Sequence, residues 1–437
     1  MDPATIAGLI LLVGIAVMIA VSVPIAVAIG LSSTIALIVL IGFDSTVLVA
    51  SQRLFTGVNS FPLLAIPFFV LAGVLMNNGG IAGRLIDAAK VLVGRAPGSL
   101  AQTNVVANAM FASVSGAAVA SAAAVGTVMT PRQAREGYDP SFSAAVNVAS
   151  APSGMLIPPS NTFIVYSLVS GSSIAALFMA GIGPGLLWVL ACMFVVHLYV
   201  RKRDELKATE RVTLTQALTT LWRAVPSLLM IIIVIGGILT GFFTPTESAA
   251  IAVLYCLVLG FIYRNLTIAQ LPGIALNAAR TTAIVMLLVG VSSILSWVLS
   301  YARLPDIIAD TILGISDSST VILILMMIIL IMVGTFMDPT PAILIFTPIF
   351  LPIVGEFGID PIHFGTMLVF NLSLGVITPP VGNVLFVGTR VAELRIEPVV
   401  RRLLPFLLAL LIMLLVVVFV PQISMWLPTQ LGLVSGG

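Results

Sequence analysis

The residues of this sequence that could do chemistry are few, and they interrupt long apolar runs. Asp338 is the most conspicuous, within the segment GTFMDPTP at 334–341. A carboxylate inside apolar sequence is costly to bury, so it indicates a cavity or a charged partner. Asp338 could instead cap a helix that starts at Pro339, a role that is compatible with attracting a cation. We expect Asp338 to lie at a binding site.

Hydroxyl, amide and small residues gather at three other interruptions. These are SVSGA at 113–117, PSGMLIPPSN at 152–161 and TPPVGN at 378–383. Hydroxyl and carbonyl oxygens suit a small hard cation, while hydroxyl, amide and backbone N–H groups can donate to a carboxylate. The candidate site residues are Ser113, Ser115, Gly116, Pro152, Ser153, Met155, Ser160, Asn161, Gly334, Met337, Asp338, Thr378, Val381 and Asn383.

The paired prolines at 158–159 and 379–380 predict broken helices. A break exposes N–H groups with a partial positive charge at one half-helix and carbonyls at the other, so the first can hold an anion and the second a cation. The alternative is that proline only kinks a span, and that small residues such as Gly181 and Gly185 only allow close helix packing. Two double-proline breaks, each after a polar segment, favour a binding site.

The composition excludes most soluble classes. Of 437 residues, 59% are hydrophobic and 8% are charged, with a mean hydropathy of +1.20, whereas a soluble domain is about 25% charged. The net charge of +2 provides no basic surface for nucleic acid. Cys192 and Cys256 lie in apolar runs and predict buried thiols, and His197 and His363 are too far apart for a metal motif.

The elements that must position the candidate residues are membrane-spanning helices. The four interruptions define two hairpins, at 98–130 and 320–354, each followed by a broken helix, at 141–170 and 361–388. We therefore predict an all-α polytopic membrane protein with two repeats, 1–200 and 224–437, joined by a cytoplasmic linker at 201–223. Each repeat would contain five spans and a re-entrant hairpin. Uninterrupted spans are expected near 4–20, 24–42, 61–78, 175–200, 225–243, 248–264, 281–301 and 403–426.

The basic residues predict the orientation of these spans. In this layout 17 of the 19 Lys and Arg residues fall on the cytoplasmic side, and only Arg53 and Arg303 fall outside. The N- and C-termini would then lie outside, and an odd number of spans makes the two repeats inverted. Inverted repeats with broken helices are typical of secondary transporters with a site at the membrane midplane.

The scarcity of acids within the spans bears on coupling. Proton-driven carriers tend to use chains of Asp, Glu and His, and only Asp338, Glu247 and His363 are available here. Glu247, in FFTPTESAA, is interpreted more simply as part of a helix start. Oxygen-rich breaks without a proton relay favour sodium. Since no Lys or Arg is expected at midplane depth, an anionic substrate would be held by hydroxyls, amides, helix N-termini and bound cations.

Five segments together resemble the large membrane subunit of tripartite ATP-independent periplasmic (TRAP) transporters, in order and over essentially the whole chain. They are SVSGAAVASAAAVGTVMTPRQAREGY (113–138), PSGMLIPPSNTFIVYS (152–167), GFFTPTESAA (241–250), MDPTPAILIFTPIFLPI (337–353) and NLSLGVITPPVGNVLFV (371–387).

The resemblance implies a sodium-driven importer of organic acids (carboxylates) in the bacterial inner membrane that works by an elevator mechanism. The implied partners are a periplasmic substrate-binding protein and a small membrane subunit of four helices. The latter is expected as a separate chain, because this sequence starts directly at its first span. The segments 81–97 and 303–317 would link a scaffold to a moving transport domain.

The resemblance also implies roles for individual residues. Ser113, Pro152 and Met155 match one sodium site, and Gly334, Met337, Thr378 and Val381 match a second. Ser115, Ser160 and Asp338 match positions around substrate and coupling ions; with Asn161 and Asn383 they are the expected substrate ligands.

Two other functions are weighed against this one. A stand-alone divalent-anion/sodium symporter of related fold would work without a binding protein. An intramembrane hydrolase would need a base beside a nucleophile such as Ser115, and no histidine is expected at that depth.

Overall fold

The chain is described here by a computed structural model that is entirely helical, without a strand, over the residues it describes. These residues are 3–21, 23–94, 96–201, 203, 206, 214–305, 307, 314 and 318–434. The side chains of residues 113–115 also lie outside the description.

The first half of the chain contains ten α-helices and two short 3-10 helices in its described residues. They are α1 (Pro3–Ala20), α2 (Ile25–Ile41), α3 (Phe43–Val58), η1 (Phe61–Leu64), α4 (Ala65–Asn78), α5 (Ile81–Val93), α6 (Ser99–Ser115), α7 (Ala118–Arg135), α8 (Pro140–Ser150), η2 (Ala151–Met155), α9 (Asn161–Ser170) and α10 (Ile174–Val200).

The described part of the second half follows a similar order. Its helices are α11 (Leu214–Leu239), α12 (Pro245–Ile262), η4 (Ile268–Gln270), α13 (Leu271–Tyr301), α15 (Ser319–Phe336), α16 (Pro339–Glu356), α17 (Pro361–Gly375), α18 (Asn383–Val391), α19 (Ile396–Phe419) and α20 (Gln422–Gln430).

Two helical hairpins and two broken helices lie where the sequence places them. The segment 98–130 consists of α6 and α7, and the segment 320–354 consists of α15 and α16. The first turn needs Gly116, whose φ of +62° is left-handed. Both breaks contain a double proline, which has no N–H to continue a helix and ends α8–η2 and α17 before α9 and α18 begin.

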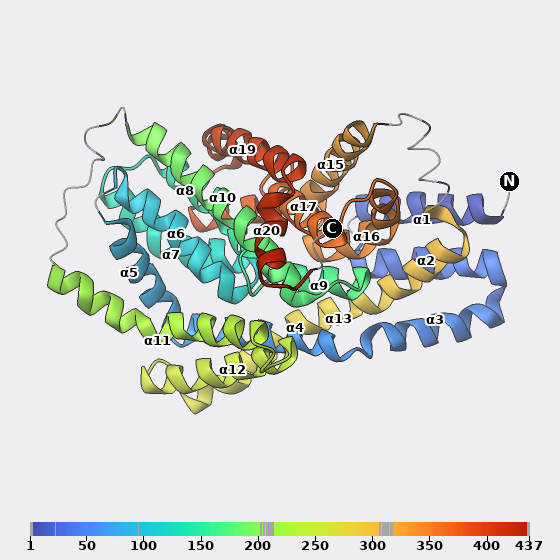
Figure 1. Cartoon of the computed structure of the whole chain (residues 1–437), viewed down its shortest axis with the longest axis horizontal. Coiled ribbons are helices and arrows are strands. Elements are labelled where there is room, and N and C mark those ends of the chain that lie inside the picture. The colour runs from blue at the N-terminus through green and yellow to red at the C-terminus, as the bar shows by residue number, and fades with distance from the viewer. Residues whose placement is uncertain are drawn as a thin grey trace.

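The hairpins and breaks of the two halves pack against one another in a crossed arrangement. Helix α7 packs on α18, and α16 packs on α9, so each hairpin contacts the broken helix of the other half. Within each half the hairpin also packs on its own break, α6 on η2 and α15 on α17. In Figure 1, α9, α16 and α17 lie near the middle of the molecule, with α6 and α7 to the left and α15 at the top.

A second group of helices lies along one side of this centre. Helix α13 packs on α2, α3 and α4, and α4 packs on α12 (Figure 1). We call α1–α4 and α11–α13 the frame, and α6–α10 with α15–α20 the central set; α5 lies between them and packs on α6 and α11. The frame contacts the central set through α4 with α6 and through α13 with α16.

Three helix boundaries differ from the sequence expectation. Helix α11 starts at Leu214, so it includes the second part of the predicted linker 201–223. Helix α13 runs without interruption from Leu271 to Tyr301, so it begins well before the span expected at 281–301. The span expected near 403–426 corresponds to α19, which begins earlier, at Ile396, and ends at Phe419, while α20 begins after Pro421. Apolar composition predicts span length but does not mark where a helix bends or ends.

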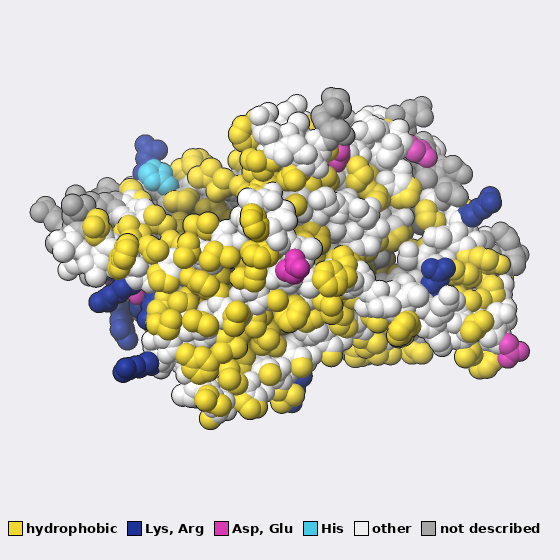
Figure 2. Space-filling model, turned by 60° about the horizontal axis from the view of Figure 1, so that its bottom comes forward, with side chains coloured by type: hydrophobic (Ala, Val, Ile, Leu, Met, Phe, Trp, Pro, Cys, Tyr) yellow, Lys and Arg dark blue, Asp and Glu magenta, His cyan; other side chains and the backbone are white. Residues whose placement is uncertain are grey.

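Among the described residues, eight helical segments are long and apolar enough to cross a membrane. They include α15 and α16, each 18 residues or about 27 Å long, so their re-entrant course stays a prediction. Figure 2 shows a surface with many hydrophobic side chains, and with Lys and Arg mostly at its left end and a few at its right. Such a surface is suited to lipid rather than water.

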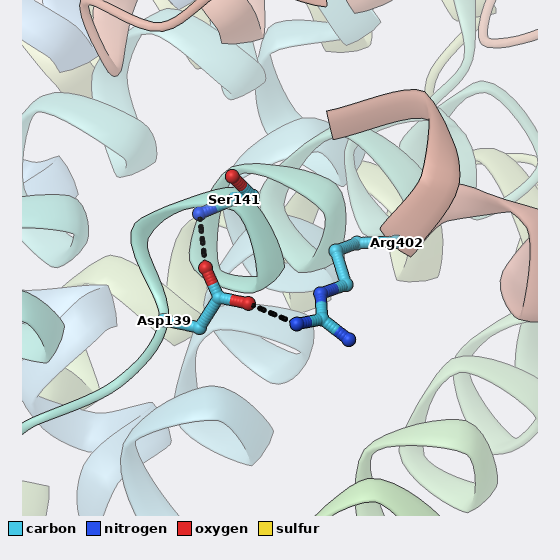
Figure 3. A network of polar contacts seen from close by, with 3 residues as sticks. All are labelled: Asp139, Ser141 and Arg402. Atoms are coloured by element: carbon cyan, nitrogen blue, oxygen red, sulfur yellow. Dashed lines mark hydrogen bonds and ion pairs between the residues drawn. The ribbon is translucent and has the colours of Figure 1, made fainter. Parts of the chain in front are cut away.

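Interactions at the start of α8 connect the two halves. The Asp139 carboxylate accepts a hydrogen bond from the Ser141 backbone N–H at 3.0 Å and pairs with the Arg402 guanidinium of α19 at 2.7 Å (Figure 3). Arg402 and Arg203 both lie over the Tyr199 ring, which stacks on Phe142.

Candidate functional site

A cavity of about 310 Å³ lies where the two hairpin turns meet the two breaks. The central set lines it with Phe111, Gly116–Ala120, Met155, Asn161, Thr162, Val165, Asp338–Thr340, Val376 and Val384. The frame closes it with Ile66, Val70, Gly73, Val74 and Asn77 of α4 and Thr281 and Val285 of α13. We call this space the central cavity. Its size suits a small organic molecule.

Several helices begin at the central cavity, so that their N-termini face it. Ala118 of α7, Asn161 of α9 and Pro339 of α16 line it, and so does Val384, the second residue of α18. None of these four helices has a side chain that caps its first N–H groups. Each N-terminus carries about half a positive charge, so four of them can bind an anion without Lys or Arg. No Lys or Arg is among the cavity-lining residues in the described part of the chain.

Among the described residues that line the central cavity, Asp338 is the one that is charged. It precedes α16 at the N-cap position, as the capping alternative predicts, but its side chain makes no cap hydrogen bond. The Asn383 side-chain amide and the Thr340 backbone N–H lie near its carboxyl group. It lies deep in the molecule and is nevertheless exposed, because it faces the cavity. Asp338 can therefore attract a cation beside a bound anion.

In the first half, too, an asparagine of the break lies beside the hairpin turn. The Asn161 side chain lies against Gly116, so close that a Cβ on Gly116 would be 2.7 Å from the amide nitrogen. In each half, an asparagine at the start of the second half-helix thus faces the hairpin turn. The first turn presents glycine backbone and the second presents a carboxylate.

Oxygen atoms converge at the first break. The Met155 carbonyl accepts hydrogen bonds from Ser160 Oγ at 2.5 Å and Thr162 Oγ1 at 2.9 Å, and the two hydroxyls are 2.7 Å apart. Ser160 is fully buried and lies behind the cavity wall, whereas Thr162 and Asn161 line it. Pro152 is buried within η2. The Ser113 and Ser115 side chains lie outside the description, so the first sodium site and the role of Ser115 stay predictions.

The second break also gathers carbonyls. A Cβ on Gly382 would lie 3.0 Å from the Val376 oxygen and 3.1 Å from the Thr378 oxygen. The backbone of Gly334 lies against Gly375, and the Gly382 N–H donates to the Thr335 carbonyl at 2.9 Å. These contacts bring the end of α15 against the second break, although Thr378 donates its hydroxyl to the Leu374 carbonyl. The grouping of Gly334, Met337, Thr378 and Val381 as one sodium site stays a prediction. The carbonyl donor set fits a small cation.

The structure adds polar lining residues that the sequence did not single out. They are Asn77, Thr162, Thr281 and Thr340. Thr162 and Thr340 each lie within two residues of a predicted site residue, so their position in the sequence could have indicated them. Asn77 and Thr281 lie near the ends of ordinary spans, where polar residues are common, and no sequence signal distinguishes them. A buried network around Asn108, which contacts Asn104, Asn147, Ser150 and Ser121, was also missed.

Other titratable residues lie elsewhere. Glu247 forms a capping box with Thr244 at the start of α12, which confirms that it marks a helix start. Cys192 and Cys256 are free and buried, as predicted. His363 bonds Ser424 Oγ at 2.6 Å and is absent from the cavity lining. Within the described ranges, no group of three His, Cys, Asp or Glu side chains could hold a metal.

A known family and individual proteins are similar to this chain. The family described as "Tripartite ATP-independent periplasmic transporter, DctM component" matches residues 12–423. The uncharacterized protein YgiK of Salmonella typhimurium is 52% identical, over 91% of this chain and 92% of its own length. The 2,3-diketo-L-gulonate TRAP transporter large permease protein YiaN of Escherichia coli is 40% identical, over 86% of this chain and 88% of its own.

A solved structure supports the fold. The chain is similar to the Alcanivorax borkumensis YdaH transporter with a TM-score of 0.57 and 16% identity, over 86% of this chain and 88% of that chain. At this identity the likeness extends to the fold alone.

Proposed function

The chain belongs to the DctM component family of TRAP transporters as a large membrane subunit, and from this premise we propose that it imports an organic acid together with sodium. It is a multi-pass membrane protein and a transporter, not an enzyme. Membership implies a small membrane subunit and a periplasmic binding protein as partners. The binding protein would deliver the acid to this chain.

The observation that carries the proposal is the convergence of four uncapped helix N-termini on the central cavity. They supply N–H donors and positive potential to a carboxylate. Asn161 and Thr340 add side-chain donors. Such a site binds an anion without a fixed positive charge, so release does not require a strong ion pair to break.

Sodium coupling is supported by the carbonyls at the opposite ends of the same breaks. Helices α15 and α17 and the 3-10 helix η2 end beside the cavity, and a helix C-terminus favours a cation. The proposed sites are Ser113, Pro152 and Met155 at the first break, and Gly334, Met337, Thr378 and Val381 at the second. Sodium bound near Asp338 would offset its charge, so that the carboxylate substrate can bind beside it.

An elevator motion would carry the central cavity across the membrane. The proposed moving part is the central set, which holds both hairpins and both breaks, and the frame would stay fixed. Helix α5 lies between the two groups, within the segment 81–97 that the resemblance assigns to a linking arm; most of the other arm, 303–317, lies outside the described residues. The location in the bacterial inner membrane, with both termini periplasmic, is part of this proposal.

The test is uptake by proteoliposomes. The chain would be reconstituted with its small membrane subunit and the cognate binding protein, loaded with the acid that copurifies with it. We expect uptake that requires an inward sodium gradient and the loaded binding protein. Uptake by this chain alone, without a binding protein, would support the stand-alone symporter instead. Uptake driven equally by a proton gradient would overturn sodium coupling.

A further inference from the structure

Two further cavities lie between α3 and α13, beside the central cavity. One, of about 280 Å³, is lined by Thr56, Gly57, Ser60, Leu168, Val169, Val289, Ser292, Ser293, Ser296 and Leu344. The other, of about 460 Å³, is lined by Arg53, Ser293, Ser296, Trp297, Ser300 and Tyr301. Because they share Ser293 and Ser296, we treat them as one space and call it the outer vestibule. In the predicted orientation it lies on the extracytoplasmic side, where Arg53 is placed.

The serines of the outer vestibule have unused hydrogen-bonding capacity. Ser292 is 3% exposed, lines the vestibule and has no hydrogen-bond partner for its hydroxyl. The hydroxyls of Ser293 and Ser296 likewise form no hydrogen bond with a described residue, unlike that of Ser300, which donates to the Ser296 carbonyl. A buried hydroxyl normally finds a partner, so Ser292 points to a ligand that supplies one.

Close helix packing holds Arg53 beside these serines. Gly57 of α3 lies against Ser293, since a Cβ there would be 2.6 Å from the Ser293 Cβ. Arg53 lies one turn before Gly57 on the same face of α3. Its side chain is exposed and pairs with no acidic group in the described part of the chain. A guanidinium beside free hydroxyls is a donor set for a carboxylate.

A thin apolar layer separates the outer vestibule from the central cavity. The same three helices line both spaces: α9 with Val165 and then Leu168, α13 with Val285 and then Val289, and α16 with Thr340 and then Leu344. Each pair is three or four residues apart, or about 5 to 6 Å along a helix. The near edge of the vestibule is therefore about one helical turn from the central cavity, and Ser292 to Ser296 lie about 10 to 17 Å from Val285 along α13.

We propose that the outer vestibule is an anion subsite in which Arg53, Ser292, Ser293 and Ser296 hold the carboxylate of the incoming acid before it reaches the central cavity. The role as a waiting site rests on the proposed function, whereas anion binding itself does not. The phosphate of a lipid headgroup has similar chemistry, and Trp297 and Tyr301 are residues typical of the lipid interface. The experiment separates these two sources.

Labelling of Ser296→Cys tests anion binding directly, because both native cysteines are buried. The probes are membrane-impermeant methanethiosulfonates, one anionic and one cationic, added outside to proteoliposomes of the complete complex. We expect Arg53→Gln to lower the ratio of anionic to cationic labelling rates about tenfold, equivalent to about 1.4 kcal/mol. Arg53→Lys should keep the ratio. An unchanged ratio in Arg53→Gln, or labelling only from the inside, would overturn the proposal.

Protection by succinate identifies the occupant. In phosphatidylcholine vesicles, succinate should slow labelling of Ser296→Cys, and Arg53→Gln or Ser292→Ala should weaken this protection. Ser51→Ala is the matched control, since Ser51 is exposed and bonds within its own helix. If added phosphatidylglycerol blocks labelling and succinate does not, the subsite holds a lipid headgroup and the waiting site is refuted.

Uptake separates failure of this subsite from failure of the proposed function. Arg53→Gln should raise KM for the loaded binding protein about tenfold with kcat nearly unchanged, while the affinity of the complex for that protein stays constant. Arg401→Gln, an exposed arginine on α19, should leave KM unchanged. Normal KM in Arg53→Gln would refute the waiting site while transport persists. Absence of uptake in the unmodified complex would contradict the proposed function but leave the labelling result intact.

Discussion

The Asp139 carboxylate uses its two oxygens for different purposes, one for the Arg402 guanidinium at 2.7 Å and one for the first turn of α8 (Figure 3). This single side chain thus caps a helix of the first half and joins it to α19 of the second half. Both partners keep part of their surface exposed, 28% for Asp139 and 44% for Arg402, so solvent weakens the ion pair.

The two functions of Asp139 can be separated by substitution. Asp139→Asn keeps an oxygen for the Ser141 N–H and removes the ion pair, which should cost less than about 1 kcal/mol. Asp139→Ala also removes the cap and should cost about 1 kcal/mol more. Thermal unfolding in detergent, in a cycle with Arg402→Gln, measures both terms. Equal losses for the Asn and Ala variants would show that the cap contributes nothing.

Because Tyr138 is buried in the turn before α8, we expect the protein to lose stability at alkaline pH. Burial raises the pKa of its hydroxyl to about 12, while the backbone N–H of Ala101 acts in the opposite direction and the charge of Glu136 raises it further. The folded pKa is above the ordinary value of 10.0. The neutral form is therefore favoured by folding; its contribution is complete below pH 10 and is lost as the pH rises towards 12.

Tyr138→Phe should flatten the dependence of the unfolding temperature on pH in this alkaline range. The matched control is Tyr301→Phe, because Tyr301 is exposed. If both variants keep the alkaline loss of the unmodified protein, another group is responsible.

The close contact between Gly334 and Gly375 leaves no space for a larger side chain at Gly375. A Cβ on Gly375 would be 2.6 Å from the Gly334 Cα, so Gly375→Ala must separate α15 from α17. Overpacking of this kind costs about 1 to 3 kcal/mol, and displacement of the second hairpin should also abolish uptake. Gly355→Ala is the matched control, since a Cβ there meets nothing within 4 Å. Equal unfolding temperatures for the two variants would contradict this packing.

Residues that are unusual for their surroundings can be singled out from the sequence. Asp338 and Asn161 line the central cavity, and a carboxylate or amide beside prolines in apolar sequence has few structural explanations. The same reasoning located the hairpin and break segments, whose composition differs from that of ordinary spans.

Residues that reach the cavity only through packing between helices far apart in the sequence were not predicted. Thr281 and Asn77 are ordinary in their helices and reach the cavity only because α13 and α4 pack beside the central set. The burial of Ser160 behind the cavity depends on the hydrogen bond to Met155, which its position after two prolines does not reveal. The sequence also did not reveal where α13 begins or that α19 and α20 are separate helices.

The carboxylate of Asp338 should determine how strongly the complex depends on sodium. Asp338→Asn preserves the size of the side chain and removes its charge, so a cation beside the second hairpin loses its counter-charge. Sodium-dependent uptake should fall about tenfold to a hundredfold, the range expected for a lost interaction with a charged group. Asn383→Ala removes the amide that interacts with Asp338 and should raise the sodium concentration needed for half-maximal uptake, with less effect on the maximal rate.

Glu247→Gln is the matched control for Asp338→Asn, because it neutralises an exposed carboxylate and keeps the oxygen that accepts from the Thr244 N–H. Its uptake and sodium dependence should match those of the unmodified complex. The measurement is initial uptake over a range of sodium concentrations, with unfolding temperatures to establish that each variant is folded. Because Asp338 is the one charge among the described residues that line the central cavity, normal uptake and sodium dependence in a folded Asp338→Asn variant would mean that coupling uses backbone carbonyls and hydroxyls alone.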